Sequence, residues 1–153
     1  MLALGCDHAG LDLKKRIISH LEEQGIACKD FGTNTADSTD YPLYAAKVAH
    51  AVLNGGCEKG ILCCSTGIGI SIAANKFDGI RAALCCSVKA AELTRSHNDA
   101  NILCLAGGEL EVPDVMRIVD TFLSTPFSGE ERHQRRIDLL GAIERGELFA
   151  VKN

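Results

Sequence analysis

The sequence predicts an α/β fold with a five-stranded parallel sheet that is covered by helices on both faces. Five short apolar runs, at residues 2–6, 26–31, 60–64, 80–85 and 102–106, each precede a longer amphipathic segment. The runs read as apolar throughout, without the alternation of a half-solvated sheet, so both faces of the sheet should be buried. This pattern is typical of a three-layer, Rossmann-like, doubly wound sandwich.

Two of the intervening segments carry an apolar stripe with the 3.6-residue period of a helix. The first stripe consists of Ala45, Val48, Ala49, Val52 and Leu53, and the second of Val115, Ile118, Val119, Phe122 and Leu123. A polar loop at residues 32–40 ends at Tyr41-Pro42, and Pro42 fits the first turn of the helix that follows.

A last helix is predicted at about residues 129–146, because Ser128-Gly-Glu-Glu131 matches a capping box. Arg132 and Arg136 lie one turn apart on one face of it, and that face continues in the aliphatic residues Leu139, Leu140 and Ile143. We expect this face to pack on a partner subunit, where the two guanidinium groups can grip a phosphate. The alternative is a solvated basic face.

Size and composition indicate one compact domain over residues 1–153. An apolar content of 46% supports a single core, and no Pro- or Gly-rich linker or internal repeat divides the chain. The net charge of -4 and the lack of Trp argue against a nucleic-acid partner. No run approaches the roughly 20 apolar residues of a membrane span, and the first run is too short for a signal peptide, so no membrane partner is expected.

The cysteine pattern favours a reducing compartment. Six of the eight cysteines lie in the apolar runs, where a free thiol behaves as a small hydrophobe. They are Cys6, Cys28, Cys63, Cys64, Cys85 and Cys104. We therefore expect free thiols and a cytoplasmic protein.

Residues 60–76 read as a buried strand, a glycine-bounded turn and a helix, which is an anion site beside a thiol. The small residues let backbone N–H groups turn toward one point at a helix N-terminus. These groups belong to Gly67, Ile68, Gly69, Ile70 and Ser71. Cys64 ends the strand in that field and should ionise more readily than in water, which suits a general base. The alternative for Cys64 is a buried structural thiol, as we expect for Cys63, which should point the opposite way.

Further polar residues should gather around the same crevice, beyond the carboxyl ends of the strands. They are Asp7 and His8 after the first strand, Ser65 and Thr66 after the third, and Ser96, His97, Asn98 and Asp99 after the fourth helix. Asp7 is alternatively a helix cap, and His97 alternatively a favourable cation at a helix C-terminus.

The pattern excludes the common cofactor motifs. Gly67-Ile-Gly69 begins like a dinucleotide fingerprint, but Ile72 stands at its last position and the motif follows the third strand. No Gly-Lys-Ser/Thr ending of a P-loop and no metal-binding Cys or His pair is present. The residues therefore predict cofactor-free chemistry on a small anion, without a metal.

Six ordered motifs that span nearly the whole chain carry a resemblance to a known family. They are Gly5-Cys-Asp-His8, Thr39-Asp-Tyr-Pro42, Cys64-Ser-Thr-Gly-Ile-Gly-Ile-Ser-Ile-Ala-Ala-Asn-Lys76, Gly79-Ile-Arg-Ala82, His97-Asn-Asp-Ala-Asn101 and Arg132-His-Gln-Arg-Arg136. With them the chain closely resembles the type B ribose-5-phosphate isomerases. That family also contains galactose-6-phosphate isomerase subunits and allose-6-phosphate isomerases.

The resemblance implies interconversion of D-ribose 5-phosphate and D-ribulose 5-phosphate through a cis-enediolate, without a cofactor, in the non-oxidative pentose phosphate pathway. Cys64 aligns with the family's catalytic cysteine. Some members carry a glutamate at the position that is Ile70 here, so this chain resembles the cysteine branch.

The remaining roles are carried over by position. The residues that assist opening of the furanose ring are Thr66 and His97. Those that contact sugar hydroxyls are Asp7, Tyr41 and Asn98, and those that hold the phosphate are His8, Arg132 and Arg136. The backbone amides from Gly67 through Ser71 stabilise the enediolate oxygen.

In the family the site is completed across a dimer, which agrees with the aliphatic stripe after Arg136. We expect a homodimer, with a dimer of dimers as the alternative. Glu109 stands where relatives often have an arginine that helps with phosphate, and Ser65 where they often have glycine. The same chemistry on a six-carbon phosphosugar, allose 6-phosphate or galactose 6-phosphate, is therefore an alternative. Another is a non-catalytic phosphosugar-binding or thiol-sensing module.

Overall fold

The computed structural model describes residues 1–108 and 111–147. The strands are β1 (Leu2–Cys6), β2 (Cys28–Asp30), β3 (Lys59–Cys64), β4 (Ala82–Leu84) and β5 (Ile102–Ala106). The helices are the 3-10 turn η1 (His8–Gly10), α1 (Leu11–Glu23), α2 (Tyr41–Leu53), α3 (Ile68–Ala74), α4 (Val88–Asn98), α5 (Val112–Ser124) and α6 (Glu131–Glu144). Each of the five predicted runs overlaps a strand, so the predicted alternation of strands and helices is confirmed.

The strands form one parallel sheet in the order β2-β1-β3-β5-β4. Their carboxyl ends therefore share one edge of the sheet, here called the carboxyl edge, and their amino ends share the opposite amino edge. The chain passes from β1 to β2 on one side and returns to β3 on the other side of β1. Doubly wound sheets bind ligands beyond the carboxyl edge at such a reversal.

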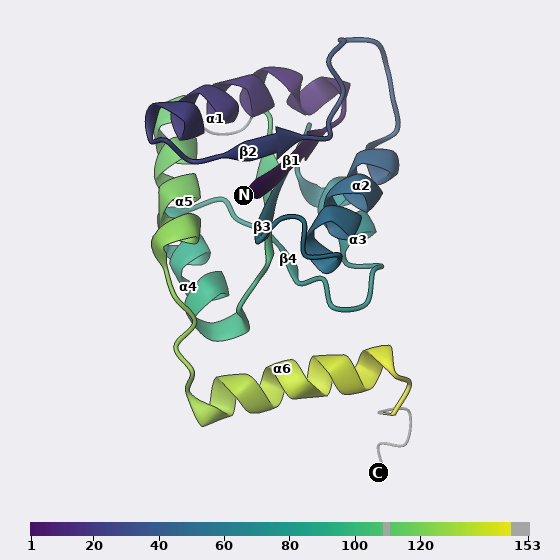
Figure 1. Cartoon of the computed structure of the whole chain (residues 1–153), viewed down its shortest axis with the longest axis vertical. Helices are drawn as coiled ribbons and strands as arrows, with labels where there is room; N and C mark the ends of the chain where they lie inside the picture. The colour runs from purple at the N-terminus through teal and green to yellow at the C-terminus, as the bar shows by residue number, and fades with distance from the viewer. Residues whose placement is uncertain (109–110, 148–153) are drawn as a thin grey trace.

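Helices cover both faces of the sheet, as predicted (Figure 1). Helices α1, α4 and α5 bury one face, with Ile17, Ala91 and Phe122 in the core. Helices α2 and α3 bury the other face with Val48 and Ile70. Because side chains alternate along a strand, β1 and β3 contribute to both cores, and apart from Lys59 at the start of β3 they carry no polar side chain.

Several local predictions need correction. Strand β2 has three residues instead of six, because it pairs with β1 alone at the sheet edge, and Lys29 and Asp30 are exposed. Leu53 ends α2 and is 43% exposed, so it lies outside the buried stripe. Helix α6 begins at Glu131, and Ser128 Oγ accepts instead from the N–H of Glu130. The predicted capping box is therefore wrong.

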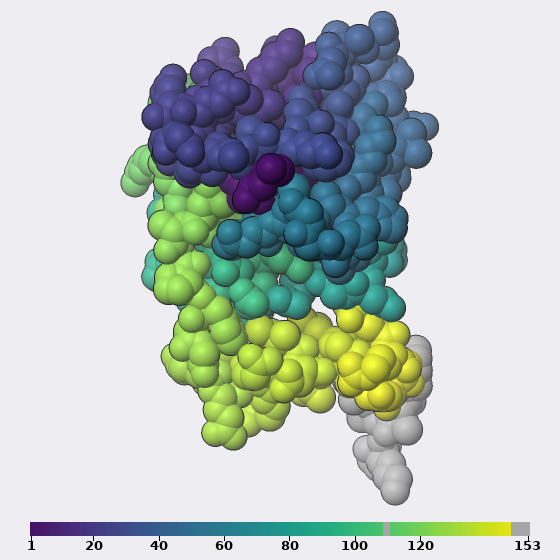
Figure 2. Space-filling view, viewed as in Figure 1, coloured from purple at the N-terminus to yellow at the C-terminus, as the bar shows by residue number. Residues whose placement is uncertain are grey.

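Helix α6 lies outside the three layers, next to the amino end of the edge strand β4, and forms a separate ridge in the space-filling view (Figure 2). Two hydrogen bonds tie this segment to the body of the molecule: Ser128 N–H donates to Ser96 O at 3.0 Å, and Gly79 N–H to Glu144 Oε1 at 2.8 Å. Its residues Leu139, Leu140 and Ile143 are exposed. Within residues 1–108 and 111–147, no helix is both long and apolar enough to cross a membrane.

Candidate functional site

The turn between β3 and α3 has a conformation that requires glycine at its first position. Gly67 has φ 72°, in the left-handed region, and a Cβ on it would lie 2.5 Å from Leu84 Cδ1 and 3.0 Å from the Leu105 carbonyl. Helix α3 begins at the next residue, Ile68. The amide groups that precede and open this helix therefore lie at the carboxyl edge, as the sequence predicts.

The five predicted amide groups are not equally available to an anion. The N–H of Ile68 donates to Thr66 Oγ1 at 3.3 Å, and the N–H of Ser71 donates to Gly67 O at 3.2 Å. Among the described residues, the amides of Gly69 and Ile70 have no hydrogen-bond partner. The Ser71 hydroxyl also turns back onto its helix, donating to Ile68 O at 2.8 Å.

Cys64 differs from the other buried thiols in its hydrogen bond. It ends β3, is 4% exposed, and its Sγ accepts from the N–H of Gly67 at 3.1 Å. Its neighbour Cys63 lies in the opposite core, as predicted. Burial raises the pKa of Cys63 and of Cys104 well above the usual range, so these thiols stay protonated. All eight cysteines lie within the described residues, and all are free.

Asp7 and His8 follow β1 and accept hydrogen bonds from the backbone of two loops. Asp7 bonds to the turn directly after it, and His8 bonds to the loop that precedes α2. Asp7 is 5% exposed, and its Oδ1 accepts from the N–H of Ala9 at 3.0 Å and of Gly10 at 3.1 Å. It therefore does cap the η1 turn. His8 Nδ1 accepts from the N–H of Thr39 at 3.2 Å. This bond places the proton of a neutral His8 ring on Nε2 and leaves that atom as a donor.

Tyr41 packs against the glycine turn. It is the first residue of α2, and a Cβ on Gly69 would lie 2.7 Å from Tyr41 Cζ and 3.0 Å from its hydroxyl oxygen. The absence of a side chain at Gly69 therefore lets the phenol of Tyr41 lie directly over the start of α3. The Thr66 hydroxyl, also exposed here, accepts from Ile68 and keeps its own hydrogen free to donate.

Gly107 joins the loops of the carboxyl edge, and the sequence reasoning missed it. Its N–H donates to Cys64 O at 2.7 Å and to Ser65 O at 3.1 Å, and a Cβ on it would lie 2.8 Å from Ala9 O. The loops after β1, β3 and β5 therefore touch one another. A glycine directly after a predicted central strand was the available signal.

His97 and Asn98 are not at this edge, so the expectation of one crevice within the chain is wrong. They are the last two residues of α4, which runs back across the sheet after β4 and ends shortly before β5 begins. A helix that connects two parallel strands ends at their amino edge. His97 and Asn98 therefore lie at the opposite edge from Cys64.

Arg132 and Arg136 lie with His97 at the amino edge, on α6. The His97 and His133 rings stack with centroids 4.2 Å apart, and His133 Nδ1 is 2.7 Å from Ser128 Oγ. Burial lowers the pKa of His133, and the neighbouring His97 lowers it further. Arg132 Nε donates to Glu130 Oε2 at 2.7 Å, which lowers the pKa of Glu130. Arg136 is exposed.

The predicted residues thus form two groups. The carboxyl-edge group contains Asp7, His8, Tyr41, Cys64, Thr66 and residues 67–71, and the amino-edge group contains His97, Asn98, Arg132 and Arg136. Glu109 lies outside the described residues. Within the described residues, no group of three or more His, Cys, Asp or Glu side chains could hold a metal ion.

Comparisons with known proteins agree with this arrangement of elements and motifs. Residues 2–140 match the model of the ribose/galactose isomerase family. The ribose-5-phosphate isomerase B of Escherichia coli is 46% identical over 144 residues, which cover 94% of this chain and 96% of the relative. That of Mycobacterium tuberculosis is 43% identical and covers 93% and 88%.

Solved structures show the same similarity. The ribose-5-phosphate isomerase B of Clostridium thermocellum superposes with a TM-score of 0.93 at 46% identity, covering 95% of this chain and 97% of that one. A structure of the Mycoplasma genitalium protein with bound ribulose-5-phosphate gives a TM-score of 0.89 at 43% identity, covering 94% and 95%. On these matches, the chain belongs to the ribose/galactose isomerase family.

Proposed function

We propose that this protein is a ribose-5-phosphate isomerase that interconverts D-ribose 5-phosphate and D-ribulose 5-phosphate in the cytoplasm, without a cofactor. One observation carries the proposal: Cys64 Sγ receives the Gly67 N–H at the mouth of a glycine turn. The identity of the substrate is inferred from the relatives named above. They are named ribose-5-phosphate isomerase B, and their similarity covers nearly the whole length of this chain.

Cys64 is the base of the proton transfer. In the open-chain aldose it takes the proton from C2, the C1 carbonyl becomes an enediolate, and the proton returns to C1 while the O2 hydroxyl proton passes to O1. An N–H directed at Sγ is the contact that a thiolate needs. The unpartnered amides of Gly69 and Ile70 lie where they can stabilise the enediolate oxygen, in company with Gly67, Ile68 and Ser71.

The polar side chains of the carboxyl edge orient the sugar. Asp7 Oδ1 is held by two backbone amides, so its carboxylate is fixed for a sugar hydroxyl, and Tyr41 faces the same turn. His8 Nε2 is a donor for the phosphate because Nδ1 is already an acceptor. The Thr66 hydroxyl, with its hydrogen free, assists opening of the furanose ring.

A second copy of the chain completes the site. His97 for ring opening, Asn98 for a sugar hydroxyl, and Arg132 and Arg136 for the phosphate lie at the opposite edge from Cys64. Exposed apolar residues flank both groups: Ile68 at 52% and Ile72 at 56% on α3, and Ile143 at 55% on α6. A twofold homodimer that places α6 of one protomer beside α3 of its partner buries both patches and assembles two sites.

The direct test is isomerisation of ribose 5-phosphate by chelator-treated protein, with wild type, Cys64→Ser and Cys63→Ser assayed together. We expect metal-independent turnover by the wild type and by Cys63→Ser. Loss of the base should lower kcat by about 10²–10⁴-fold in Cys64→Ser, with KM little changed. Full turnover by Cys64→Ser would contradict the thiol base. Turnover of allose 6-phosphate or galactose 6-phosphate, with none of ribose 5-phosphate, would assign a six-carbon substrate instead.

A further inference from the structure

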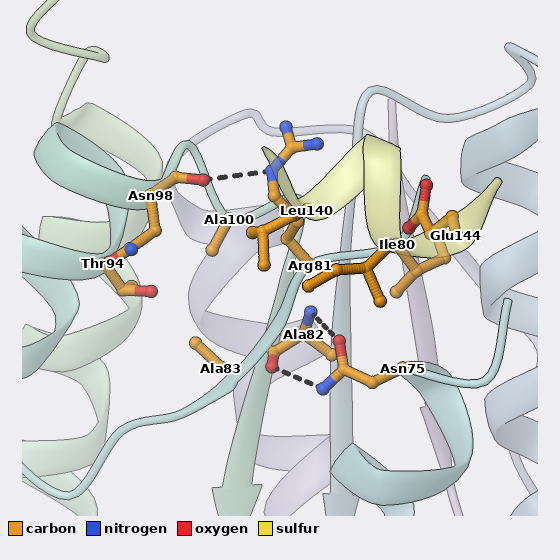
Figure 3. A pocket seen from close by; sticks show the side chains of 11 residues that line it. Asn75, Ile80, Arg81, Ala82, Ala83, Thr94, Asn98, Ala100, Leu140 and Glu144 are labelled. Carbon is orange, nitrogen blue, oxygen red and sulfur yellow. Dashed lines mark hydrogen bonds between the residues drawn. The ribbon is translucent and has the colours of Figure 1, made fainter. Parts of the chain in front are cut away.

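Arg81, in the motif Gly79-Ile-Arg-Ala82, has no role in the proposed isomerisation mechanism. Its guanidinium group donates hydrogen bonds to the residues that end α4. Its Nε donates to Asn98 O at 3.0 Å and to Asp99 O at 3.1 Å. Its Nη2 donates to Asp99 O at 2.8 Å and to Asp99 Oδ2 at 3.1 Å. Figure 3 shows the guanidinium directed at the main chain of Asn98. Arg81 therefore holds two consecutive carbonyl groups where the helix ends.

A second arginine holds the same turn from inside the molecule. Arg95 Nη1 donates to Asp99 Oδ1 at 2.7 Å and to Ala100 O at 2.6 Å, and the Arg95 side chain is 8% exposed. The Asp99 carboxylate therefore lies between two guanidinium groups. Hydrogen bonds between ionised groups are shorter and stronger than neutral ones, and cations suit the C-terminus of a helix. We call Arg81, Arg95 and Asp99 the α4 clamp.

The backbone inside the clamp is strained. Asp99 has φ 45° and ψ 45°, and among the described residues it is the sole non-glycine residue with a positive φ. Such a conformation persists when the surroundings fix it, and it is frequent at functional sites.

Arg81 is itself held rigidly. Its N–H donates to Asn101 Oδ1 at 2.8 Å, and Asn101 Nδ2 donates to Gly79 O at 2.8 Å. The N–H of Asn101 in turn donates to Arg81 O at 3.1 Å. The motifs at residues 79–82 and 97–101 therefore form one hydrogen-bonded unit.

Side-chain packing alone does not fix the end of α4. Arg81 and Asn98 line a cavity of ≈ 370 Å³ with Leu140 and Ile143 of α6 (Figure 3). Asn98 is exposed, and His97 is covered in part by the His133 ring. The clamp therefore adds side-chain restraints to the backbone hydrogen bonds from Asp99 N–H to Arg95 O and from Ala100 N–H to Thr94 O.

We propose that Arg81 is a positioning residue of the isomerase: through the α4 clamp it fixes the direction in which His97 and Asn98 meet the sugar ring. This inference rests on the proposed function. It predicts a specific defect, because His97 serves ring opening. Misplacement by about 1 Å can lower a rate on the order of 10²-fold.

The two substrates separate a positioning role from a structural one. Ribose 5-phosphate closes a furanose ring through its C4 hydroxyl, whereas ribulose 5-phosphate has its C5 hydroxyl blocked by the phosphate and stays open. The equilibrium constant fixes the ratio of the two kcat/KM values in every variant, so the informative quantity is kcat at saturating substrate. A variant that opens rings poorly should lose kcat with ribose 5-phosphate and largely keep kcat with ribulose 5-phosphate. A fold or assembly defect removes active sites and lowers both rates by the same factor.

We would measure kcat at saturating substrate in both directions for wild type, Arg81→Gln, Arg81→Lys and the control Arg117→Gln. Arg117 carries an exposed ion pair on α5. We expect Arg81→Gln to lose about 10²-fold with ribose 5-phosphate and far less with ribulose 5-phosphate. Arg81→Lys keeps the positive charge but not the planar guanidinium group. Its turnover of ribose 5-phosphate should lie between those of the wild type and Arg81→Gln. Equal losses in both directions, or no loss, would overturn the inference.

A double-mutant cycle with His97→Ala keeps the inference testable if Arg81→Gln is destabilised. If Arg81 acts through His97, Arg81→Gln should cost little further in the His97→Ala background. Additive losses would overturn the positioning role. A wild type inactive on both pentose phosphates would instead overturn the proposed function, and the inference with it.

Discussion

At the scale of single residues, Gly67 has two roles. It allows the sharp backbone turn after β3, and it donates a hydrogen bond to the Cys64 thiol. Its positive φ lets the chain turn sharply after β3, and the same turn brings its N–H to 3.1 Å from Cys64 Sγ. The sequence predicts the turn because glycines follow a buried strand. It does not predict how the five amides divide their hydrogen bonds, which depends on the side chain of Thr66 and on helix geometry.

Gly67→Ala tests this dual role, with Gly25→Ala as a matched control. Both glycines have φ near the same value, 72° and 70°, but a Cβ on Gly25 meets nothing within 4 Å. Each alanine should cost about 1–2 kcal/mol for the left-handed conformation. Gly67→Ala should cost more, because its Cβ meets Leu84 and Leu105, and it should also lose activity. Urea unfolding and kcat measure this. Equal losses of stability with full activity in both variants would contradict it.

At the scale of elements, the direction of α4 decides where its residues act. The sequence predicts a helix that ends near His97, and it groups the residues from Ser96 to Asp99 with those that follow the strands. Because α4 runs from the carboxyl edge to the amino edge, that grouping is wrong within one chain. The order β3-β5-β4 and the contact between His97 and His133 depend on tertiary packing, so no periodicity in the sequence reveals them.

The docking of α6 on α4 should be sensitive to pH through His133. Burial, with the nearby His97, lowers the pKa of His133 in the folded protein, so the unfolded chain binds a proton more readily than the folded one. The contribution of neutral His133 to the free energy of unfolding is therefore complete above the pKa of about 6.5 that a histidine has in the unfolded chain. This contribution declines as the pH falls below that value.

His133→Asn keeps a polar atom near Ser128 but cannot titrate. We expect its Tm to fall less steeply than that of the wild type between about pH 7 and pH 5, at equal protein concentration. Gln134→Ala, an exposed neighbour on α6, should keep the wild-type slope. A His133→Asn slope equal to that of the wild type would show that His133 does not titrate with unfolding in this range.

At the scale of the whole molecule, the proposed dimer makes the carboxyl-edge group and the amino-edge group two halves of one site. The fold itself follows from patterns along the sequence, since apolar runs and helical stripes report burial of each element. The assignment of residues to the two halves does not follow from these patterns. A residue next to an apolar run can lie at either edge of the sheet without changing the pattern. The proposed dimer would bury the exposed side chains of Ile68 and Ile72 in one half and of Ile143 in the other.

A dimer of two defective protomers tests whether the halves meet across the interface. A heterodimer of Cys64→Ala and His97→Ala, isolated with two different affinity tags, should have one intact site and about half the turnover of the wild-type dimer. The matched control pairs Cys64→Ala with Thr66→Ala. Both of these residues belong to the carboxyl edge, so each site of that heterodimer carries one substitution and no activity should return. If the first heterodimer stayed inactive despite confirmed assembly, all the residues of a site would come from one protomer.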